Sequence, residues 1–168
     1  MKRFLCIFLI ILLAVPLCAC SFRGLESGDG YTFFYRRTEF QYGVESGIIE
    51  SEKRDISGHD GDLFFLITLY LSGPLEENLV SPFPVSTRLL SVEQDDANIL
   101  IKLTDSGSPL LDSEHSLACV CLALTCLEIP EIEQVTIQYR DRTITLNQSS
   151  VTLFDTGAHP QSVTEDTQ

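Results

Sequence analysis

The sequence predicts an α+β domain in which a small, largely antiparallel sheet carries two helices packed on one face. Two apolar runs of helical length end at strong terminators, residues 63–71 before Ser72-Gly73-Pro74 and residues 113–127 before Pro130. Short aromatic or alternating segments, typical of strands, lie before, between and after these runs. This order of strands and helices favours helices on one face of an antiparallel sheet.

The composition is that of one acidic globular domain with tails. The chain has 168 residues, of which 44% are apolar, so it can bury a core and wholesale disorder is excluded. Its formal net charge of −13 argues against binding to nucleic acid, which requires clustered basic residues. Only three histidines and no tryptophan leave little material for a chemical site.

The N-terminus has the features of a targeting segment. Lys2 and Arg3 precede the apolar run Phe4–Val15, which is too short for a transmembrane helix but typical of a secretory signal. The tetrapeptide that follows, Leu17-Cys18-Ala19-Cys20, resembles the bacterial lipobox, in which the last cysteine is lipidated. An ordinary signal peptide cut nearby, or an uncleaved anchor, is the alternative interpretation.

Lipidation of Cys20 predicts a protein tethered by its N-terminus to the extracytoplasmic face of the cell membrane. The acidic domain is expected to be repelled by anionic lipid headgroups. The predicted divisions of the chain are a lipoprotein signal peptide (1–19), a lipid-anchored linker (20–30), a folded domain (31–153) and a disordered tail (154–168).

The first half of the domain is predicted from local patterns. Residues 31–35 are aromatic, as is typical of a strand, whereas Gly43 and Gly47 break the extended segment that follows. Asp60 or Asp62 is expected to cap the first helix. The predicted elements are a strand at 31–35, an irregular extended segment at 40–50, a turn at 57–61, a helix at 63–71 and a loop at 76–86 kept irregular by Pro82 and Pro84.

The second half is predicted in the same way. Ile99, Ile101 and Leu103 alternate with other residues and therefore share one face of a strand. Asp112 or Ser113 is expected to cap the second helix. The predicted elements are a hairpin of strands at 87–92 and 98–103, a loop at 105–109, a helix at 113–127, strands at 135–139 and 143–146, and a strand extension at 151–153 before a polar tail from residue 155.

Three cysteines lie on the second predicted helix: Cys119, Cys121 and Cys126. Cys119 and Cys126 would be about 10.5 Å apart along the helix axis, whereas a disulfide requires Cα atoms within about 7 Å. His115 and Cys119 share a helix face and could begin a zinc site, but Cys126 lies too far along the helix to complete it. The favoured interpretation is that the thiols are small buried hydrophobes.

The second helix also raises the question of a contact surface. Residues 117–124 include no polar side chain, so the helix must be covered on more than one side. Complete burial by the sheet and the first helix is favoured over a remaining exposed face. Any apolar surface left over is expected at 117–124 or on the aromatic strand 31–35, where a less acidic partner would dock.

No residue is predicted to be catalytic or to bind a cofactor or a metal. His59, Asp60 and Asp62 could hold a cation, but their spacing is more typical of a solvated turn and a helix cap. Motifs for a phosphate loop, a calcium loop and a serine hydrolase are absent from the sequence. The chain is therefore not expected to be an enzyme.

Three motifs occur in a characteristic order: Leu71-Ser72-Gly73-Pro74, the proline-containing loop and strand at 81–92, and the helix end and strand at 124–139. Together they resemble the GerMN domain, the sporulation and spore germination domain, over about residues 31–146. Several positions depart from the family pattern, among them the three cysteines of the second predicted helix. Ser86 stands where Gly is usual, and Ala97 and Arg142 occupy turn positions where Gly is common, so these turns are expected to differ in type.

The resemblance implies a non-enzymatic lipoprotein domain that acts in endospore formation or germination, similar in fold to the ring-building domains of the channel between mother cell and forespore. The expected function is a membrane-anchored assembly module. Its expected partners are the membrane, through the lipid on Cys20, and protein components of a sporulation or germination complex. The alternative is a small extracytoplasmic enzyme or metal-binding lipoprotein that uses His59, Asp60, Asp62, or His115 with Cys119.

Overall fold

The computed structural model describes residues 30–39, 47–59, 61–107 and 109–155, the side chains of residues 152–155 excepted. The predicted signal peptide, Cys20 and the linker as far as residue 29 lie outside the described residues, as does the tail from residue 156. The divisions of the chain predicted in those parts stay predictions.

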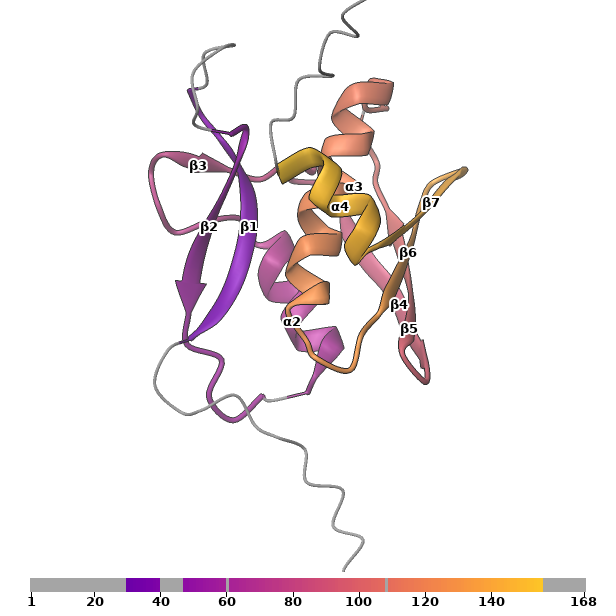
Figure 1. Ribbon diagram of the computed structural model, residues 1–168. Helices are drawn as coiled ribbons and strands as arrows, with labels where there is room; N and C mark the ends of the chain where they lie inside the picture. Colours follow the sequence, from indigo (N-terminus) through magenta and orange to yellow (C-terminus); the bar gives the residue numbers. More distant parts are fainter. Residues whose placement is uncertain (1–29, 40–46, 60, 108, 156–168) are drawn as a thin grey trace, which may run out of the picture.

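The described residues form seven strands and three helices (Figure 1). In chain order these are β1 (Tyr31–Arg37), β2 (Ile49–Arg54), α2 (Leu63–Leu71), β3 (Leu79–Val80), β4 (Arg88–Asp95), β5 (Asn98–Thr104), α3 (Asp112–Leu127), β6 (Gln134–Tyr139), β7 (Arg142–Asn147) and α4 (Gln148–Asp155).

The strands divide between two sheets, where the sequence predicts one. The first sheet is antiparallel, with the strand order β2–β1–β3. The second has the order β4–β5–β6–β7 and is antiparallel except for the central pair β5–β6, which is parallel. Helix α3 connects β5 to β6, because parallel neighbours require a long crossover rather than a tight turn.

Helix α3 lies between the two sheets and contacts β1 on one side and β6 and β7 on the other (Figure 1). Helix α2 packs against β4. The predicted α+β class, with two helices packed against a small sheet, is confirmed: α2 contacts β4, and α3 contacts β6 and β7 of the four-stranded sheet. Beyond the prediction, β1 of a second sheet also contacts α3. Residues 117–124 give the physical reason, since a helix that is apolar on every side is stable only when it is covered on more than one side.

A threonine of α3 joins the helix to the edge of β1. The hydroxyl of Thr125 donates to the carbonyl oxygen of Cys121, 3.0 Å away, and its oxygen accepts the backbone N–H of Phe34 at 3.0 Å. The hydroxyl of Tyr31 donates to the carbonyl oxygen of Thr125 at 2.5 Å. These bonds satisfy strand and helix groups that would otherwise be buried without partners.

Both ends of α2 follow the sequence prediction. A carboxylate oxygen of Asp62 accepts the backbone N–H of Phe65 at 2.9 Å and so caps the first turn. The helix ends at Leu71, and Gly73 adopts φ +93°, a conformation that glycine reaches without steric cost. Pro74 then prevents the helix from continuing.

The turns of the β4–β5 and β6–β7 hairpins hold the positive-φ residues that glycine usually supplies. The residues concerned are Asp96, at φ 50°, and Arg140, at φ 58°, rather than Ala97 and Arg142, which the comparison with the GerMN pattern singled out. Aspartate tolerates this conformation better than most side chains do. The β4–β5 pairing also contains an irregularity between Leu89 and Ser91.

Four local predictions are wrong. The second strand occupies 49–54 rather than 40–50, and residues 40–46 lie outside the described residues. Residues 79–80 of the predicted loop form β3, because they pair with Arg36 and Arg37 of β1. The segment 148–155 is a helix rather than a strand extension. Helix α3 has no side-chain cap from Asp112 or Ser113; instead the carboxylate of Glu114 accepts the backbone N–H of Leu111 at 3.1 Å.

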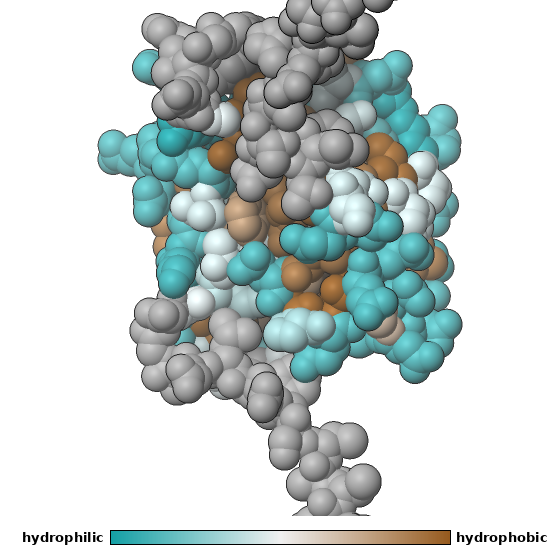
Figure 2. All heavy atoms as spheres, in the orientation of Figure 1, coloured by the Kyte–Doolittle hydropathy of each residue, from teal (hydrophilic) through white to brown (hydrophobic). Residues whose placement is uncertain are grey.

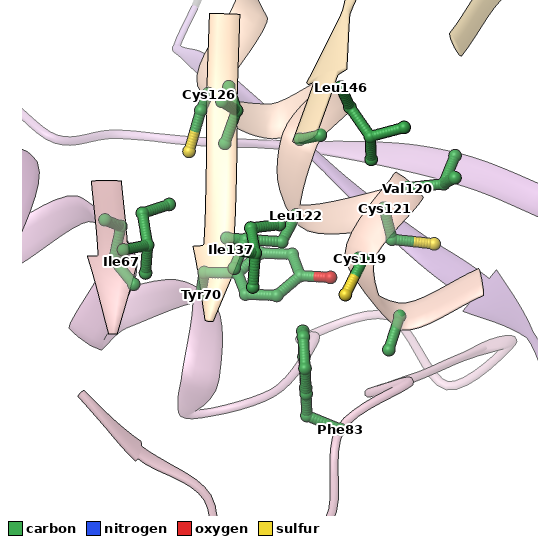
Figure 3. Packing of buried hydrophobic residues seen from close by; sticks show 14 of the residues in the cluster. Ile67, Tyr70, Phe83, Cys119, Val120, Cys121, Leu122, Cys126, Ile137 and Leu146 are labelled. Carbon is green, nitrogen blue, oxygen red and sulfur yellow. The ribbon is translucent and has the colours of Figure 1, made fainter. Parts of the chain in front are cut away.

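The core fills the space around α3 (Figure 3). The rings of Tyr35 and Tyr70 stack with centroids 4.8 Å apart, and the hydroxyl of Tyr35 donates to the carbonyl oxygen of Tyr70 at 3.0 Å. The largest fully buried side chains come from both sheets and three helices: Tyr35, Tyr70, Tyr139, Phe33, Ile67, Ile99, Ile101, Leu122, Ile137, Val120, Val135 and Val151.

Candidate functional site

His115 and Cys119, the pair considered and disfavoured as the start of a zinc site, lie together inside the core. The Sγ atom of Cys119 is 3.7 Å from Nε2 of His115, and both residues are buried. Burial raises the pKa of the Cys119 thiol to about 12 and lowers the pKa of His115. A neutral thiol beside a neutral imidazole in a closed core is a packing contact rather than an activated nucleophile.

The other two helix thiols are also buried, which confirms that they act as small hydrophobes. Cys121 and Cys126 are free and fully enclosed, and burial raises the pKa of each to about 12. Figure 3 shows the hydroxyl of Tyr70 pointing toward Cys119 and Cys121. Within the described part of the chain, no three His, Cys, Asp or Glu side chains gather closely enough to hold a metal ion.

The second candidate cluster, around His59, serves the start of α2. The His59 ring stacks on the ring of Phe65 with centroids 3.7 Å apart, and His59 is exposed. The carboxylate of Asp62 accepts the backbone N–H of Phe65 and so caps the helix. Asp60 lies outside the described residues. The described members of this cluster are therefore placed for helix capping and stacking.

The sequence prediction missed a buried ion pair on β2. Glu52 and Arg54 are two residues apart on the same face of the strand, and each is at least nine-tenths buried. The Nε atom of Arg54 donates to a Glu52 carboxylate oxygen at 2.5 Å. The Arg54 guanidinium also lies over the ring of Phe33, 5.1 Å from its centroid.

This ion pair fixes the end of α2 and the turn after it. Arg54 donates to the carbonyl oxygen of Leu69, in the last turn of α2, and to that of Gly73, in the turn that follows. The Glu52 carboxylate accepts the backbone N–H groups of Leu75 and Glu76, both at 3.0 Å. Only the i, i+2 spacing of two opposite charges on a strand could have indicated the pair, and that spacing is common on exposed strands.

A second buried carboxylate, Asp105, ties three segments of the second sheet together. It accepts hydrogen bonds from the hydroxyl of Ser86, from the backbone N–H of Gly107 at 2.9 Å, and from the hydroxyl of Tyr139 at 2.8 Å. The bond from Ser86 is the largest cause of the lowered pKa of Asp105, followed by the Gly107 bond. Ser86, which departs from the glycine of the GerMN pattern, thus has a structural partner here.

The apolar surface is not where the sequence places it. Tyr31, Phe33 and Tyr35 of β1 are buried, and most of 117–124 is enclosed, with Leu117 and Leu124 half-buried. Figure 2 shows a face covered largely by hydrophilic residues, with hydrophobic atoms visible between them. The strongly exposed large apolar side chains in the described part of the chain are Phe64, Leu75, Val85, Leu90 and Leu111.

Four of these five exposed side chains lie between residues 64 and 90, on α2, on β4 or on the loops beside them. We use the name α2–β4 side for α2, β4, the loops beside them and the groove between the helix and the strand; its exposed apolar residues are Phe64, Leu75, Val85 and Leu90. The groove has a volume of about 220 Å³ and is lined by Thr68, Leu71, Ser72, Thr87, Arg88 and Leu89. Among the described helices, none is both long and apolar enough to cross a membrane.

Comparison with protein-family models and with curated proteins finds no match. The solved structures that are similar to the chain include the following two. A Clostridium perfringens protein, provisionally described as a lipoprotein, is 18% identical over 78% of this chain and 95% of its own, with a TM-score of 0.46. The tandem GerMN domains of the Bacillus subtilis sporulation protein GerM are 17% identical over 67% of this chain and 39% of that chain, with a TM-score of 0.48. Both TM-scores fall below the level that establishes a common fold.

Proposed function

We propose that the chain is a lipoprotein held by Cys20 on the extracytoplasmic face of the cell membrane, and that its α+β domain is a non-catalytic assembly module in sporulation or spore germination. The anchor is supported by the basic residues Lys2 and Arg3, the apolar run Phe4–Val15 and the lipobox-like Leu17-Cys18-Ala19-Cys20. The process is supported by the three motifs that resemble the GerMN domain.

One observation carries the assembly role. The side chains best suited to chemistry are used in packing and capping, whereas several large apolar side chains of α2, β4 and the loops beside them remain exposed. His115 and Cys119 are enclosed in the core, and Asp62 caps α2. Phe64 and Leu90 are 52% and 62% exposed. Such side chains are available to a protein partner, which is a common use of apolar surface that a domain leaves exposed.

The anchor and the charge of the domain together favour a protein partner. Two or more acyl chains on one cysteine hold a protein durably at a bilayer. The net charge of −13 disfavours contact between the domain body and anionic lipid headgroups. The domain is then free at the end of its tether to meet other proteins.

The anchor is tested in the native bacterium by deleting the gene and restoring it with defined variants. Cys20→Ala is expected to lose incorporation of labelled palmitate and to leave the membrane fraction, because the thiol is the site of acylation. Recovery of the Cys20→Ala protein in acylated form would overturn the lipoprotein assignment.

The absence of catalysis is tested by the double variant His59→Ala, Cys119→Ala in the same strain, with its abundance and unfolding midpoint measured in parallel. This variant lacks two candidate chemical groups. It is expected to restore spore formation and germination as well as the wild-type gene does, because the proposed assembly role needs neither group. A folded, abundant double variant that fails to restore either process would favour the enzyme or metal-binding alternative.

A further inference from the structure

The α2–β4 side combines an apolar groove with an open strand edge. Strand β4 pairs with β5 on one side and has no strand on its other side in the described part of the chain. Thr68 and Leu71 of α2 form one wall of the groove, and residues 87–89 form the other. An unpaired strand edge presents backbone N–H and C=O groups to an incoming chain. The start of β4 also lines the groove, opposite Leu71 of α2.

The irregularity in β4 restricts what can pair there. The register with β5 shifts between Leu89 and Ser91, and Leu90 at this position is 62% exposed. Such bulges bend and twist an edge, so that a flat strand of arbitrary sequence pairs with it poorly. The exposed Leu90 side chain requires an apolar neighbour on the incoming chain.

The charges along β4 define the chemistry and direction of a complementary chain. Arg88, at the start of the strand, is the only charged residue that lines the groove. The other end of the hairpin carries the exposed acids Asp95 and Asp96, and also Glu93, which already pairs with Lys102 at 2.7 Å. A complementary antiparallel strand therefore has basic residues near its N-terminus and an acidic residue near its C-terminus. A second copy of this chain is disfavoured, because each copy carries a net charge of −13.

We propose that an extended, apolar segment of a less acidic partner protein adds to β4 as an antiparallel strand. Its apolar side chains lie in the groove between α2 and β4, and its N-terminal basic residues face Asp95 and Asp96. This mode of recognition uses main-chain hydrogen bonds for affinity and side-chain pockets for specificity. The proposal rests on the assembly role proposed above and assigns that role to a surface.

The test uses the full chain in detergent micelles and a designed eight-residue peptide. The peptide alternates valine and threonine and carries two lysines at its N-terminus and one glutamate at its C-terminus. The control peptide has the same central valines and threonines but the opposite charges at its ends, with two glutamates at its N-terminus and one lysine at its C-terminus. Titration followed by backbone amide NMR is expected to shift signals of β4 and α2, with the control binding about tenfold more weakly.

Two protein variants locate the site. Leu90→Lys is expected to weaken binding of the first peptide about tenfold or more, because it places a charge at the exposed position on the edge. Leu111→Lys is the matched control, since Leu111 is 69% exposed and lies outside the α2–β4 side; this variant is expected to bind like the wild type. The unfolding midpoints of both variants are expected to match that of the wild type.

Three outcomes would overturn the proposal: no shifts in β4 at millimolar peptide, equal affinity for the two peptides, or unchanged binding by Leu90→Lys. Self-association through β4, detected by sedimentation and abolished by Leu90→Lys, would replace the partner with a second copy. A chain that binds no peptide at β4 but is still anchored through Cys20 and still joins a protein complex would contradict this proposal and leave the assembly role standing. Loss of acylation without loss of peptide binding would contradict only the anchor.

Discussion

Helices α2 and α3 are both rich in apolar residues, yet they occupy different environments. Helix α3 lies between the two sheets, and Leu122 at its centre is fully buried. Helix α2 packs against β4 and leaves Phe64 half exposed. The residues that could suggest chemistry, His115 and Cys119, belong to the enclosed helix. The apolar runs therefore predict both helices. How much of each helix stays exposed to a partner depends on the strands and helices packed around it.

The largest effect is expected at the buried ion pair that fixes the exposed helix. Arg54→Ala is expected to cost about 3–5 kcal/mol in the free energy of unfolding, because it leaves the Glu52 carboxylate buried without its cation. Urea unfolding of both proteins at pH 7 measures the difference. The matched control is Lys102→Ala, whose exposed pair with Glu93 is expected to contribute about 0–1 kcal/mol. Equal costs for the two variants would show that Arg54 does not hold the end of α2.

The two helices are compared directly by truncating one apolar side chain on each. Leu122→Ala is expected to cost about 2–5 kcal/mol, since it opens a cavity in a closed core. Phe64→Ala is expected to change the free energy of unfolding by less than about 1 kcal/mol, because about half of this side chain is already in water. A larger cost for Phe64→Ala than for Leu122→Ala would contradict the distinction between an enclosed and an exposed helix.

The helices and the hairpin could be predicted because their signals are local. The Ser72-Gly73-Pro74 terminator and the Asp62 cap act within one turn of the residues they affect. The division into two sheets could not be predicted, because β1 and β6 meet α3 only after segments far apart in sequence have come together. Strand β3 contains only two residues, and its one partner, β1, lies about forty residues earlier.

The buried polar groups were missed for the same reason. The partners of Glu52 and Arg54 include backbone groups at residues 69–76, so no short sequence window contains the network. Asp105 meets Ser86 and Tyr139 only through sheet pairing. Burial of the thiols could be predicted, because their neighbours along the helix are apolar on every side. The open edge of β4 depends on the order of the strands in the sheet, which the sequence does not specify.

Asp105 tests whether the loop before β4 is held by a charged group. Asp105→Asn is expected to cost about 1–3 kcal/mol at pH 7, because three donors lose an ionised acceptor. The lowered pKa of Asp105 means that its stabilisation is present above the unfolded pKa of about 4 and is lost as pH falls through the folded value. Urea unfolding at pH 7 and pH 3 should therefore show a smaller loss of stability for Asp105→Asn than for the wild type. An identical loss in both proteins would exclude this role.

Among the changes to buried side chains, the smallest effect is expected at the thiols of the enclosed helix. Cys119→Ala is expected to cost about 1–2 kcal/mol, since it leaves a small cavity beside His115. In the native protein, Cys119, Cys121 and Cys126 are expected to react with a thiol reagent only as fast as the domain opens, because burial raises the pKa of each to about 12. Rapid labelling of all three thiols under native conditions would show that α3 is open to solvent.

The central claim is that the α2–β4 side, rather than other exposed apolar positions, meets a protein partner. It is tested most directly in the native bacterium by placing a photo-reactive amino acid at position 90 or at position 111, both exposed leucines in the wild type. Illumination is expected to give a covalent adduct with a second protein from position 90, joined through an extended segment of that protein, and none from position 111. An adduct from position 111 alone, equal adducts from both positions, or no adduct from position 90 would contradict the claim.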